Sequence, residues 1–235
     1  MDEIPEGGPA KQAAPKTAAE SQKNNTEQSQ QSMRIARADD DQESKELARC
    51  IRRGDLIAFP TETFYAVGGN ALSLTLCERV FLLKQRPRNK PLLVLAEPRQ
   101  MTELVHIDEP WVKKLIERFM PGPLTLVLPV KAGSPEWLAD AKGTLAVRWS
   151  SSPEVAKLIA LARVPLIGTS ANLSGKPENT ESEEVRKEFG ESLDWLIAGG
   201  SAPGGMPSTI LDATSFPCKL LREGAIPTSE LKEFL

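Results

Sequence analysis

Short apolar runs with the character of buried strands alternate along the chain with stripes of apolar residues at helical spacing. The run 56–59, which Pro60 stops, predicts a strand, and the stripe of Leu76, Val80 and Leu83 predicts a helix. By the same criteria we expect strands at 56–59, 92–96, 124–130, 145–149, 166–169, 195–198, 209–212 and 219–222, and helices at 44–51, 76–83, 111–119, 153–162 and 183–189. The alternation predicts an α/β fold of the α+β type, a mixed sheet of about seven strands flanked by helices. The short spacing between residues 195 and 222 favours antiparallel pairing there.

The first 42 residues lack this pattern. They are rich in Gln, Asn, Ser, Ala, Lys and Glu, and the first aromatic residue of the chain is Phe59. Such a segment cannot bury enough apolar surface to offset the entropy lost on ordering it. The sequence therefore predicts a disordered polar tail over 1–42 and one folded domain over 43–235. The whole chain has a net charge of −3, of which residues 1–46 carry −4 and residues 47–235 carry +1.

The composition narrows the chemistry. The only histidine, His106, lies between two apolar residues without a metal-ligand partner at helical spacing, which disfavours schemes that need several histidines. The three cysteines are far apart and form no C-x-x-C pair, so we expect a reducing compartment and no zinc ribbon. No apolar run approaches the roughly 18 to 20 residues of a membrane span, and the N-terminus lacks a signal-peptide core. We expect a cytoplasmic protein without membrane association which, if it is an enzyme, works by charge and positioning.

Four cations lie within seven residues in the segment 84–91, which reads KQRPRNKP. Two prolines stiffen this segment, and no acidic residue occurs between Glu78 and Glu97. Arginine offers two parallel donors to a phosphate and lysine a compact charge, so the segment favours a site for a polyanion. The alternative is a solvated basic loop.

A run of small polar residues, GTSANLSG at 168–175, begins in the predicted strand 166–169 and continues past it. Hydroxyls, an amide and glycines at a strand end let a ligand approach the backbone closely, and ligands of α/β sheets often bind there. The alternative is a turn that caps a helix. The chain has neither a Walker A pattern nor a G-x-G-x-x-G, so any nucleotide must be held without these phosphate loops.

Two further segments carry polar groups beside predicted strands. The first is FPTETFYAVG at 59–68, which contains the only tyrosine of the chain. Its Glu62 could act as a base, bind a metal or pair with one of the cations at 84–90, whereas Thr61 or Thr63 could simply cap a helix. The second is PSTILD at 207–212, which follows the glycine-rich stretch GGSAPGG at 199–205.

Together these segments resemble the YrdC/Sua5 family of threonylcarbamoyl-adenylate synthases over residues 45–226. The resemblance rests on seven motifs in the family's order, namely PTET at 60–63, K-x-R-P with a downstream KPL at 84–92, PGPLTLVL at 121–128, AVR at 146–148, TSANLSG at 169–175, PSTILD at 207–212 and LREGAI at 221–226. It implies a mixed, twisted sheet with a concave basic face. We expect the short, single-domain form of the family.

The resemblance also implies an activity. Such an enzyme, a nucleotidyltransferase, makes threonylcarbamoyl-AMP and pyrophosphate from L-threonine, bicarbonate and ATP, with Mg²⁺ accompanying the ATP. The product serves the t6A modification of tRNA and passes to a threonylcarbamoyl transferase of the Kae1/TsaD type. By motif, the catalytic signature falls on Lys84, Arg86, Ser170 and Asn172. The ATP-binding positions are Arg86, Lys90, Thr144, Ser170 and Arg222, and the threonine-binding positions are Thr63, Arg148, Gly168 and Ser208. No protein ligand for a metal is implied.

The implied chemistry suits the residues present. Threonine carbamate is already an anionic oxygen nucleophile, so its attack on the α-phosphate needs charge neutralisation more than a general base. Lys84, Arg86 and Lys90 can supply that charge, and a guanidinium such as Arg148 suits the carboxylate of an amino acid. The scarcity of histidine is then no obstacle.

Two departures from the family pattern bear on substrate fit, and one alternative function stays open. Ala66 in YAVG stands where the family often has glycine, and RWSSSP at 148–153 replaces a segment of the R-x-P type. The alternative is a non-catalytic module of the same fold that binds double-stranded RNA or tRNA with an affinity that falls steeply with salt. The K-x-R and S-x-N elements favour the enzyme, because binding to an RNA backbone needs no small amide and hydroxyl pocket.

Overall fold

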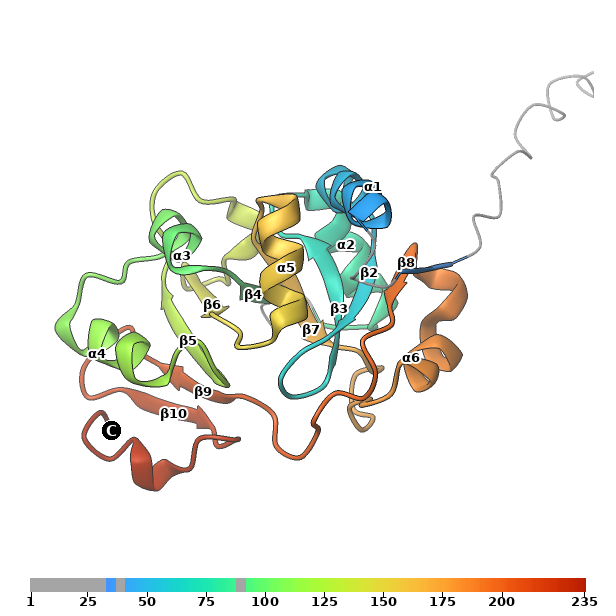
Figure 1. Cartoon of the computed structure of the whole chain (residues 1–235). Helices are drawn as coiled ribbons and strands as arrows, with labels where there is room; N and C mark the ends of the chain where they lie inside the picture. Colours follow the sequence, from blue (N-terminus) through green and yellow to red (C-terminus); the bar gives the residue numbers. More distant parts are fainter. Residues whose placement is uncertain (1–32, 37–40, 88–91) are drawn as a thin grey trace, which may run out of the picture. The chain divides into compact units, whose positions relative to one another are not determined.

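The computed structural model describes residues 33–36, 41–87 and 92–235, and ten strands from these ranges form one mixed sheet (Figure 1). The strands are β1 (Arg34–Ala36), β2 (Ile57–Pro60), β3 (Tyr65–Asn70), β4 (Leu93–Leu95), β5 (Leu124–Pro129), β6 (Thr144–Arg148), β7 (Leu166–Ser170), β8 (Trp195–Ile197), β9 (Thr209–Asp212) and β10 (Lys219–Arg222). The helices are α1 (Asp41–Arg53), α2 (Leu74–Leu83), α3 (Pro98–Leu104), α4 (Pro110–Phe119), α5 (Pro153–Ala162) and α6 (Ser182–Phe189), with 3-10 turns at Glu136–Leu138, Gly190–Ser192 and Thr228–Glu230.

The sheet has the strand order β1-β8-β2-β3-β7-β4-β6-β5-β9-β10. Pairing is parallel at β1–β8, β2–β8, β4–β6 and β5–β9, and antiparallel at the other neighbours. The predicted fold class is confirmed, although the sheet contains more strands than expected. Antiparallel pairing between 195 and 222 is correct for β9 and β10. It is wrong for β8, which pairs in parallel with β1 and β2 far from β9 in the strand order.

Strand β1 lies inside the range that the sequence predicts to be a disordered tail. Ala36 is buried in the core, and the Arg34 guanidinium lies 4.2 Å from the ring centroid of Trp195 and pairs with Glu46. These contacts supply the apolar and aromatic partners that the tail sequence itself lacks. The expected tail is therefore wrong for 34–36, whereas residues 1–32 and 37–40 lie outside the described residues.

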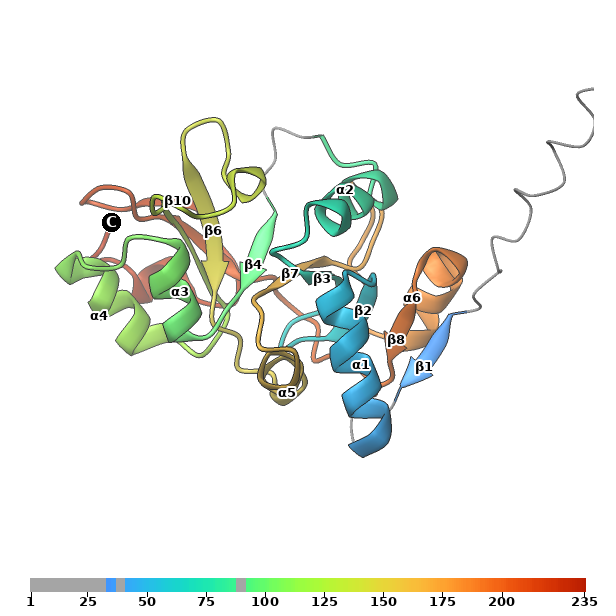
Figure 2. The ribbon, with the colours of Figure 1, turned by 90° about the horizontal axis from the view of Figure 1, so that it is seen from above.

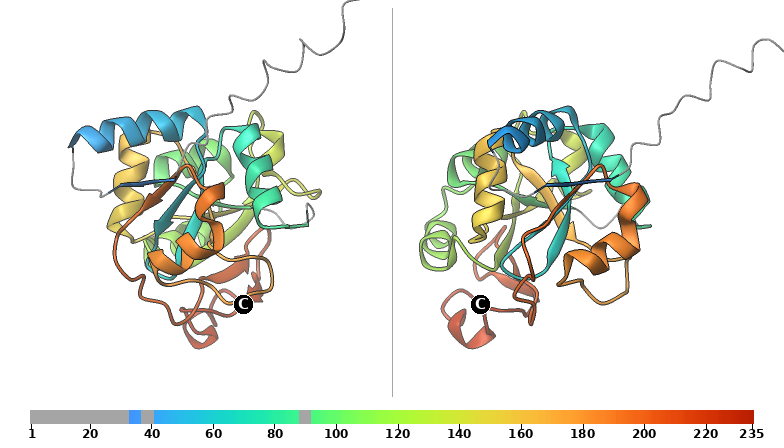
Figure 3. Two further views of the ribbon diagram at one scale, coloured as in Figure 1. Left: turned by 90° about the vertical axis from the view of Figure 1, so that its right-hand side faces the viewer. Right: turned by 45° about the vertical axis from the view of Figure 1, so that its right-hand side comes forward.

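Helices cover both faces of the central strands. Figure 2 shows α1 and α5 on one side of β3 and β7 and α2 on the other, and both views of Figure 3 show α1 packed across α5. The first face is sealed by one apolar cluster, formed mainly by α1, α5 and the strands beneath them, which includes Ile51, Phe59, Leu158, Ile159 and Trp195. A larger cluster on the opposite face joins α2, α4 and α6 to the same sheet and includes Leu76, Val80, Leu115, Leu126 and Phe189.

Local signals set several helix ends as the sequence predicts. The backbone N–H of Gly54 bonds to the carbonyl of Ile51 at 3.0 Å with φ of 102°, which ends α1. Ser152 accepts from the N–H of Val155 and Pro153 follows it, so α5 begins where the periodicity places it. Ser44 does not cap α1, because that helix already begins at Asp41. Across the described residues no helix is long and apolar enough to cross a membrane.

Candidate active site

A cavity of about 710 Å³ opens on one face of the sheet. Its wall takes alternate residues of neighbouring strands, for example Thr125 with Val127 on β5 and Ala146 with Arg148 on β6. The intervening Leu126 and Val147 point into the larger core cluster instead. Helices α1 and α5 cover the strands at one end of this face, and the cavity occupies the uncovered part.

Most of the residues singled out by sequence meet in this cavity. The lining contains Thr63, Arg86, Arg148, Gly168, Ser170, Ser208 and Arg222. Thr144 does not line it. This residue begins β6 on the same face as Ala146 and Arg148, and its N–H bonds to Asp140 Oδ1 at 2.8 Å. Lys90 lies outside the described residues.

Lys84 supports the cavity wall without lining the cavity. It caps the C-terminus of α2 and is 2% exposed. Its Nζ donates to the backbone carbonyl of Ser170 and, at 2.7 Å, to that of Asn172, and lies 3.3 Å from Asn172 Oδ1. Burial, helped by the charge of Arg86, lowers the pKa of Lys84 to about 8. The ammonium therefore ties the end of α2 to the loop that follows β7.

The S-x-N element is bonded within itself and to α2. Ser170 Oγ donates to Asn172 Oδ1 at 2.7 Å, and Asn172 Nδ2 donates to the Lys176 carbonyl at 2.5 Å. Ser174 Oγ donates to the Lys84 carbonyl at 2.9 Å. Neither Asn172 nor Ser174 caps a following helix, since α6 begins only at Ser182. The loop thus presents the Ser170 hydroxyl on the cavity wall in a fixed position.

Arg148, at the end of β6, is buried beside Glu62 from the turn between β2 and β3. Glu62 Oε1 lies 2.5 Å from Arg148 Nη2 and accepts from Nε at 3.2 Å, while Nε also donates to the Gly122 carbonyl at 3.2 Å. Nη2 is itself buried against Glu62, and Arg148 lines the cavity. Burial raises the pKa of Glu62, but the charge of Arg148 and the hydroxyl of Ser150 outweigh it and lower the pKa.

This pairing decides between the roles that the sequence left open for the 60–65 segment. Glu62 pairs with a cation, but the cation is Arg148 and not one from 84–90. Thr61 Oγ1 donates to the Phe64 carbonyl at 2.8 Å and accepts from the N–H of Thr63 at 3.1 Å, so it closes a turn between two strands. The expected alternative of a helix cap is wrong here, because β3 follows the turn.

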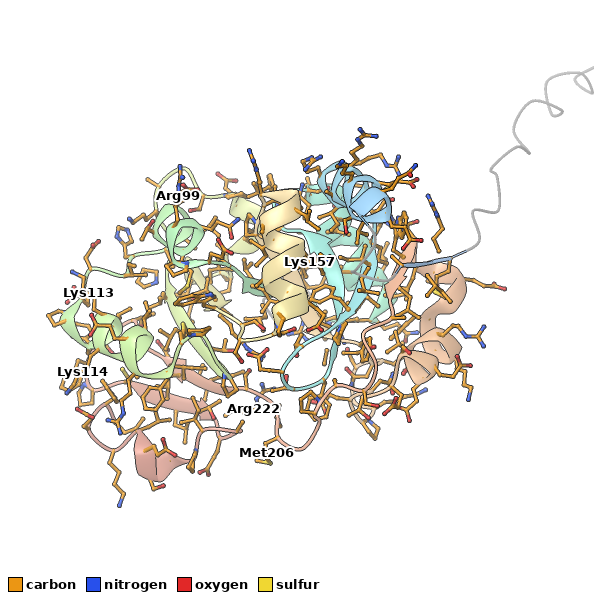
Figure 4. The ribbon with its side chains drawn as sticks, in the orientation of Figure 1. Arg99, Lys113, Lys114, Lys157, Met206 and Arg222 are labelled. Carbon is orange, nitrogen blue, oxygen red and sulfur yellow. The ribbon has the colours of Figure 1, made fainter. Side chains whose placement is uncertain are left out.

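Ser208, another residue of the cavity lining, is held by two neighbours. Arg222 donates to the Ser208 carbonyl from Nη2 at 2.7 Å and from Nε at 3.1 Å, and Ser208 Oγ lies 2.9 Å from Thr125 Oγ1. Burial lowers the pKa of both Arg222 and Arg86. In Figure 4, Arg222 is labelled below the loop that joins β2 and β3, and both that loop and Arg222 contribute to the cavity lining.

The cavity wall is cationic. Its charged lining consists of three guanidinium groups, from Arg86, Arg148 and Arg222, and the carboxylate of Glu178. Sequence reasoning missed Glu178. A signal was available, because it is the first acidic residue after Glu154, just beyond the TSANLSG motif. Such a wall suits a ligand with several negative charges.

Both departures from the family pattern lie at this site. Ala66 lines the cavity and pairs with Ser170 across β3 and β7. In the RWSSSP segment, Ser150 and the N–H of Ser151 bond to Glu62, and Ser152 caps α5. Ser150 and Ser151 therefore hold the carboxylate that holds Arg148.

The remaining candidates carry no site in the structure. His106 is exposed and outside the cavity lining. Cys50, Cys77 and Cys218 are free and buried. In the described part of the chain no group of three or more His, Cys, Asp or Glu residues could hold a metal ion. A metal at the cavity would thus depend on oxygens from a ligand.

Comparison with known proteins identifies relatives of this chain. The family model Sua5/YciO/YrdC, described as telomere recombination, matches residues 49–224. The threonylcarbamoyl-AMP synthase of Pyrococcus abyssi is 39% identical over 186 residues, which are 79% of this chain and 55% of that protein. The Bacillus subtilis protein of the same name is 34% identical over 195 residues, 82% of this chain and 56% of the relative. The chain thus spans about half the length of these two curated relatives.

A solved structure agrees with the sequence relationship. The crystal structure of P. abyssi Sua5 complexed with L-threonine superimposes with a TM-score of 0.80 at 36% identity, covering 86% of this chain and 60% of that one. The match of the family model extends from α1 to the glutamate and glycine after β10, and so includes every strand that lines the cavity. The chain therefore belongs to the Sua5/YciO/YrdC family.

Proposed function

We propose that this protein is an L-threonylcarbamoyladenylate synthase, which forms threonylcarbamoyl-AMP and pyrophosphate from L-threonine, bicarbonate and ATP. One observation carries the proposal. The cavity brings the positions implied for ATP, Arg86, Ser170 and Arg222, onto one wall with those implied for threonine, Thr63, Arg148, Gly168 and Ser208. The names of the relatives support the same activity.

The amino-acid end of the site is set by Arg148. Its guanidinium is oriented by Glu62 and the Gly122 carbonyl and lines the cavity, which suits it to the carboxylate of threonine. Ser208 and Thr63 offer neutral hydroxyl groups on the same cavity wall. In this proposal the amine of threonine has first combined with bicarbonate to give the carbamate and water.

The phosphate end neutralises charge. A carbamate oxygen attacks the α-phosphorus of ATP, a bond forms between them, and the bond from that phosphorus to the bridging oxygen of pyrophosphate breaks. Arg86 and Arg222 lie in the wall where the added negative charge needs stabilisation. The Ser170 hydroxyl, which donates to Asn172 Oδ1 in the free site, would turn to donate to a phosphate oxygen. Mg²⁺ bound to ATP, when present, neutralises phosphate charge further. Lys84 holds the Ser170 and Asn172 backbone during this step.

A pyrophosphate-release assay tests the proposal. Release should require ATP, threonine and bicarbonate together, and omission of any one should abolish it. Ser170→Ala and Lys84→Ala should each reduce the rate strongly while the protein stays folded by circular dichroism. Wild-type protein that binds ATP and yet releases no pyrophosphate with threonine and bicarbonate would refute this function.

The wider setting forms part of the same proposal. The product would act in the cytoplasm and pass to a Kae1/TsaD-type transferase that modifies tRNA. The alternative, a non-catalytic binder of double-stranded RNA or tRNA, is less well supported, because Arg86, Ser170 and Arg222 line one cavity and backbone binding to RNA needs no such pocket. An RNA affinity that falls with salt and ignores threonine would favour the alternative.

A further inference from the structure

Glu178 contributes a carboxylate to a cavity wall whose other charged groups are all guanidinium groups. It is half-buried and lies in the loop between β7 and α6. Within residues 33–36, 41–87 and 92–235, its side chain has neither a hydrogen bond nor an ion pair. A carboxylate in this position works against the binding of a polyanion unless something cationic lies between them.

The backbone around Glu178 is fixed. The carbonyl of the next residue, Asn179, accepts from the N–H of Tyr65 at 2.9 Å, and Asn179 Nδ2 donates to the Ala171 carbonyl at 2.7 Å and to Glu188 Oε2 at 2.8 Å. These bonds anchor the loop to β3, to the S-x-N element and to α6. The Glu178 side chain is therefore presented to the cavity by a rigid support, although nothing in the described protein engages its oxygens.

The negative charge of Glu178 affects the pKa values of two basic residues at the phosphate end of the site. Burial dominates the lowered pKa values of Lys84 and Arg222, and the Glu178 carboxylate opposes that lowering at both residues. Glu178 and the guanidinium of Arg222 line the same cavity. Magnesium ions in nucleotide sites are held by one or two protein carboxylates together with phosphate oxygens and water. Glu178 meets that requirement, and no group of three acids is needed.

We propose that Glu178 is a protein ligand of the Mg²⁺ that accompanies ATP in this cavity. The metal would be the cation that lies between the Glu178 carboxylate and the phosphate chain. The inference rests on the proposed function for its nucleotide, but it assigns a residue that the sequence motifs do not. It also separates two groups of the wall. Arg86 and Arg222 meet phosphate directly, and Glu178 meets it through the metal.

Binding of the α,β-methylene analogue of ATP tests this role, because the bond cleaved in the proposed reaction is blocked in that analogue. Calorimetry is run with EDTA and then with Mg²⁺, for wild type and for Glu178→Gln. In wild type, Mg²⁺ should tighten binding of the analogue by about tenfold. In Glu178→Gln the metal-free analogue should bind more tightly than to wild type, because a negative charge is gone, and the gain from Mg²⁺ should fall below about twofold.

Tighter metal-free binding together with a smaller gain from Mg²⁺ is a result that a merely structural role for Glu178 would not produce. Glu191→Gln, an exposed change on the turn after α6, is the matched control and should behave as wild type. Glu178→Gln removes no hydrogen bond within the described residues, so thermal unfolding should match wild type. Equal metal dependence in Glu178→Gln and wild type would overturn the proposal. So would a variant whose defect is confined to threonine binding, since that would assign the carboxylate to the α-ammonium group.

The proposed function can be rejected independently of the Glu178 assignment. A wild-type protein that binds the analogue with the expected metal dependence but makes no threonylcarbamoyl-AMP would leave the Glu178 assignment standing and reject the synthase.

Discussion

Glu62 fixes Arg148: the carboxylate does not line the cavity, whereas the guanidinium that it holds does. Glu62 Oε1 also accepts from the N–H of Ser151 at 3.1 Å, and Oε2 accepts from the Ser150 hydroxyl. The carboxylate is thus anchored by the loop that follows β6 as well as by the guanidinium itself. A positively charged donor is in this way oriented before substrate arrives, which lowers the cost of ordering it on binding.

Glu62→Gln should impair threonine binding more than turnover. The neutral amide leaves the buried charge of Arg148 without its partner and lets the guanidinium rotate, so KM for threonine should rise by about tenfold or more with a smaller change in kcat. The free energy of unfolding should fall by about 3 kcal/mol. Steady-state kinetics and urea denaturation measure the two effects. A rise in the KM for ATP with that for threonine unchanged would contradict the assignment of Arg148.

The same ion pair should make stability depend on pH in a defined direction. The folded-state pKa of Glu62 is lowered from an ordinary value of 4.5, so the folded protein binds the proton less readily than the unfolded chain. The contribution to stability is then complete above about pH 4.5 and is lost as the pH falls through the folded pKa. Urea denaturation from neutral to acidic pH should show the difference between wild type and Glu62→Gln shrinking below pH 4.5. A difference that stays constant would argue against the pair.

Lys84 should give nucleotide binding an alkaline limit. Its pKa of about 8 means that the ammonium loses its proton as the pH rises through that value. The carbonyls of Ser170 and Asn172 then lose donors and the site loses a positive charge, so affinity for the α,β-methylene analogue should fall above pH 8. Lys84→Arg cannot lose its charge in this range and should bind less well but without that fall. A parallel decline in both proteins would show that another group titrates.

Gly168 should tolerate no side chain unless its neighbour is shortened. A Cβ added there would lie 2.4 Å from Leu95 Cδ1, which is itself on the cavity wall. Gly168→Ala should lower the free energy of unfolding by about 1 to 3 kcal/mol, and combining it with Leu95→Ala should cost less than the sum of the two single changes. Thermal or urea unfolding of the four proteins measures this coupling.

Gly68→Ala is the matched contrast. A Cβ at this position would lie 1.9 Å from the backbone carbonyl oxygen of Ile167, which no side-chain substitution can move. Gly68→Ala should therefore be more destabilising than Gly168→Ala and should gain nothing from Leu95→Ala. Equal costs for the two glycines would contradict the packing described for β3 and β7.

Truncation should separate the described strand β1 from the residues before it. Deletion of residues 1–32 is predicted to leave turnover and stability nearly unchanged. Deletion of 1–37 also removes β1, which exposes Trp195 and the parallel edge of β8. We expect a loss of about 1 to 2 kcal/mol, or about 3 to 6 °C in Tm. A large effect of the shorter deletion would contradict the sequence-based expectation for the tail.

Elements with a clear period were predictable, and short or irregular ones were not. Helix α5 and strand β9 coincide with their predicted ranges because cap, apolar stripe and strand alternation agree there. Strand β3 was missed because YAVGGN is rich in glycine, and helix α3 because two buried residues, Met101 and Leu104, make too short a stripe. Strand β1 depends on Trp195, a partner that no local pattern reveals.

Some features of the candidate site were likewise predictable from the sequence, and others were not. The family resemblance identified Arg86, Ser170, Ser208 and Arg222 as site residues, and all four line the cavity. Residue type alone pointed to the basic segment that contains Arg86 and to the polar run that contains Ser170. Burial could not be predicted for Lys84, whose neighbours in the sequence are those of an exposed loop. The partner of Glu62 was also out of reach, because no spacing links a turn near residue 60 to the end of a strand at 148.

The parallel pairing of β5 with β9 has a consequence for how the protein is made. Leu124 pairs with Thr209, so one wall of the cavity is completed by a segment that leaves the ribosome long after β5 itself. Until then the β5 edge lacks its neighbour and presents open backbone groups, which makes the nascent chain a substrate for chaperones. The many long-range contacts also predict slow folding for a domain of this size. A ribosome-bound chain that stops after β8 should therefore be protease-sensitive and bind no nucleotide.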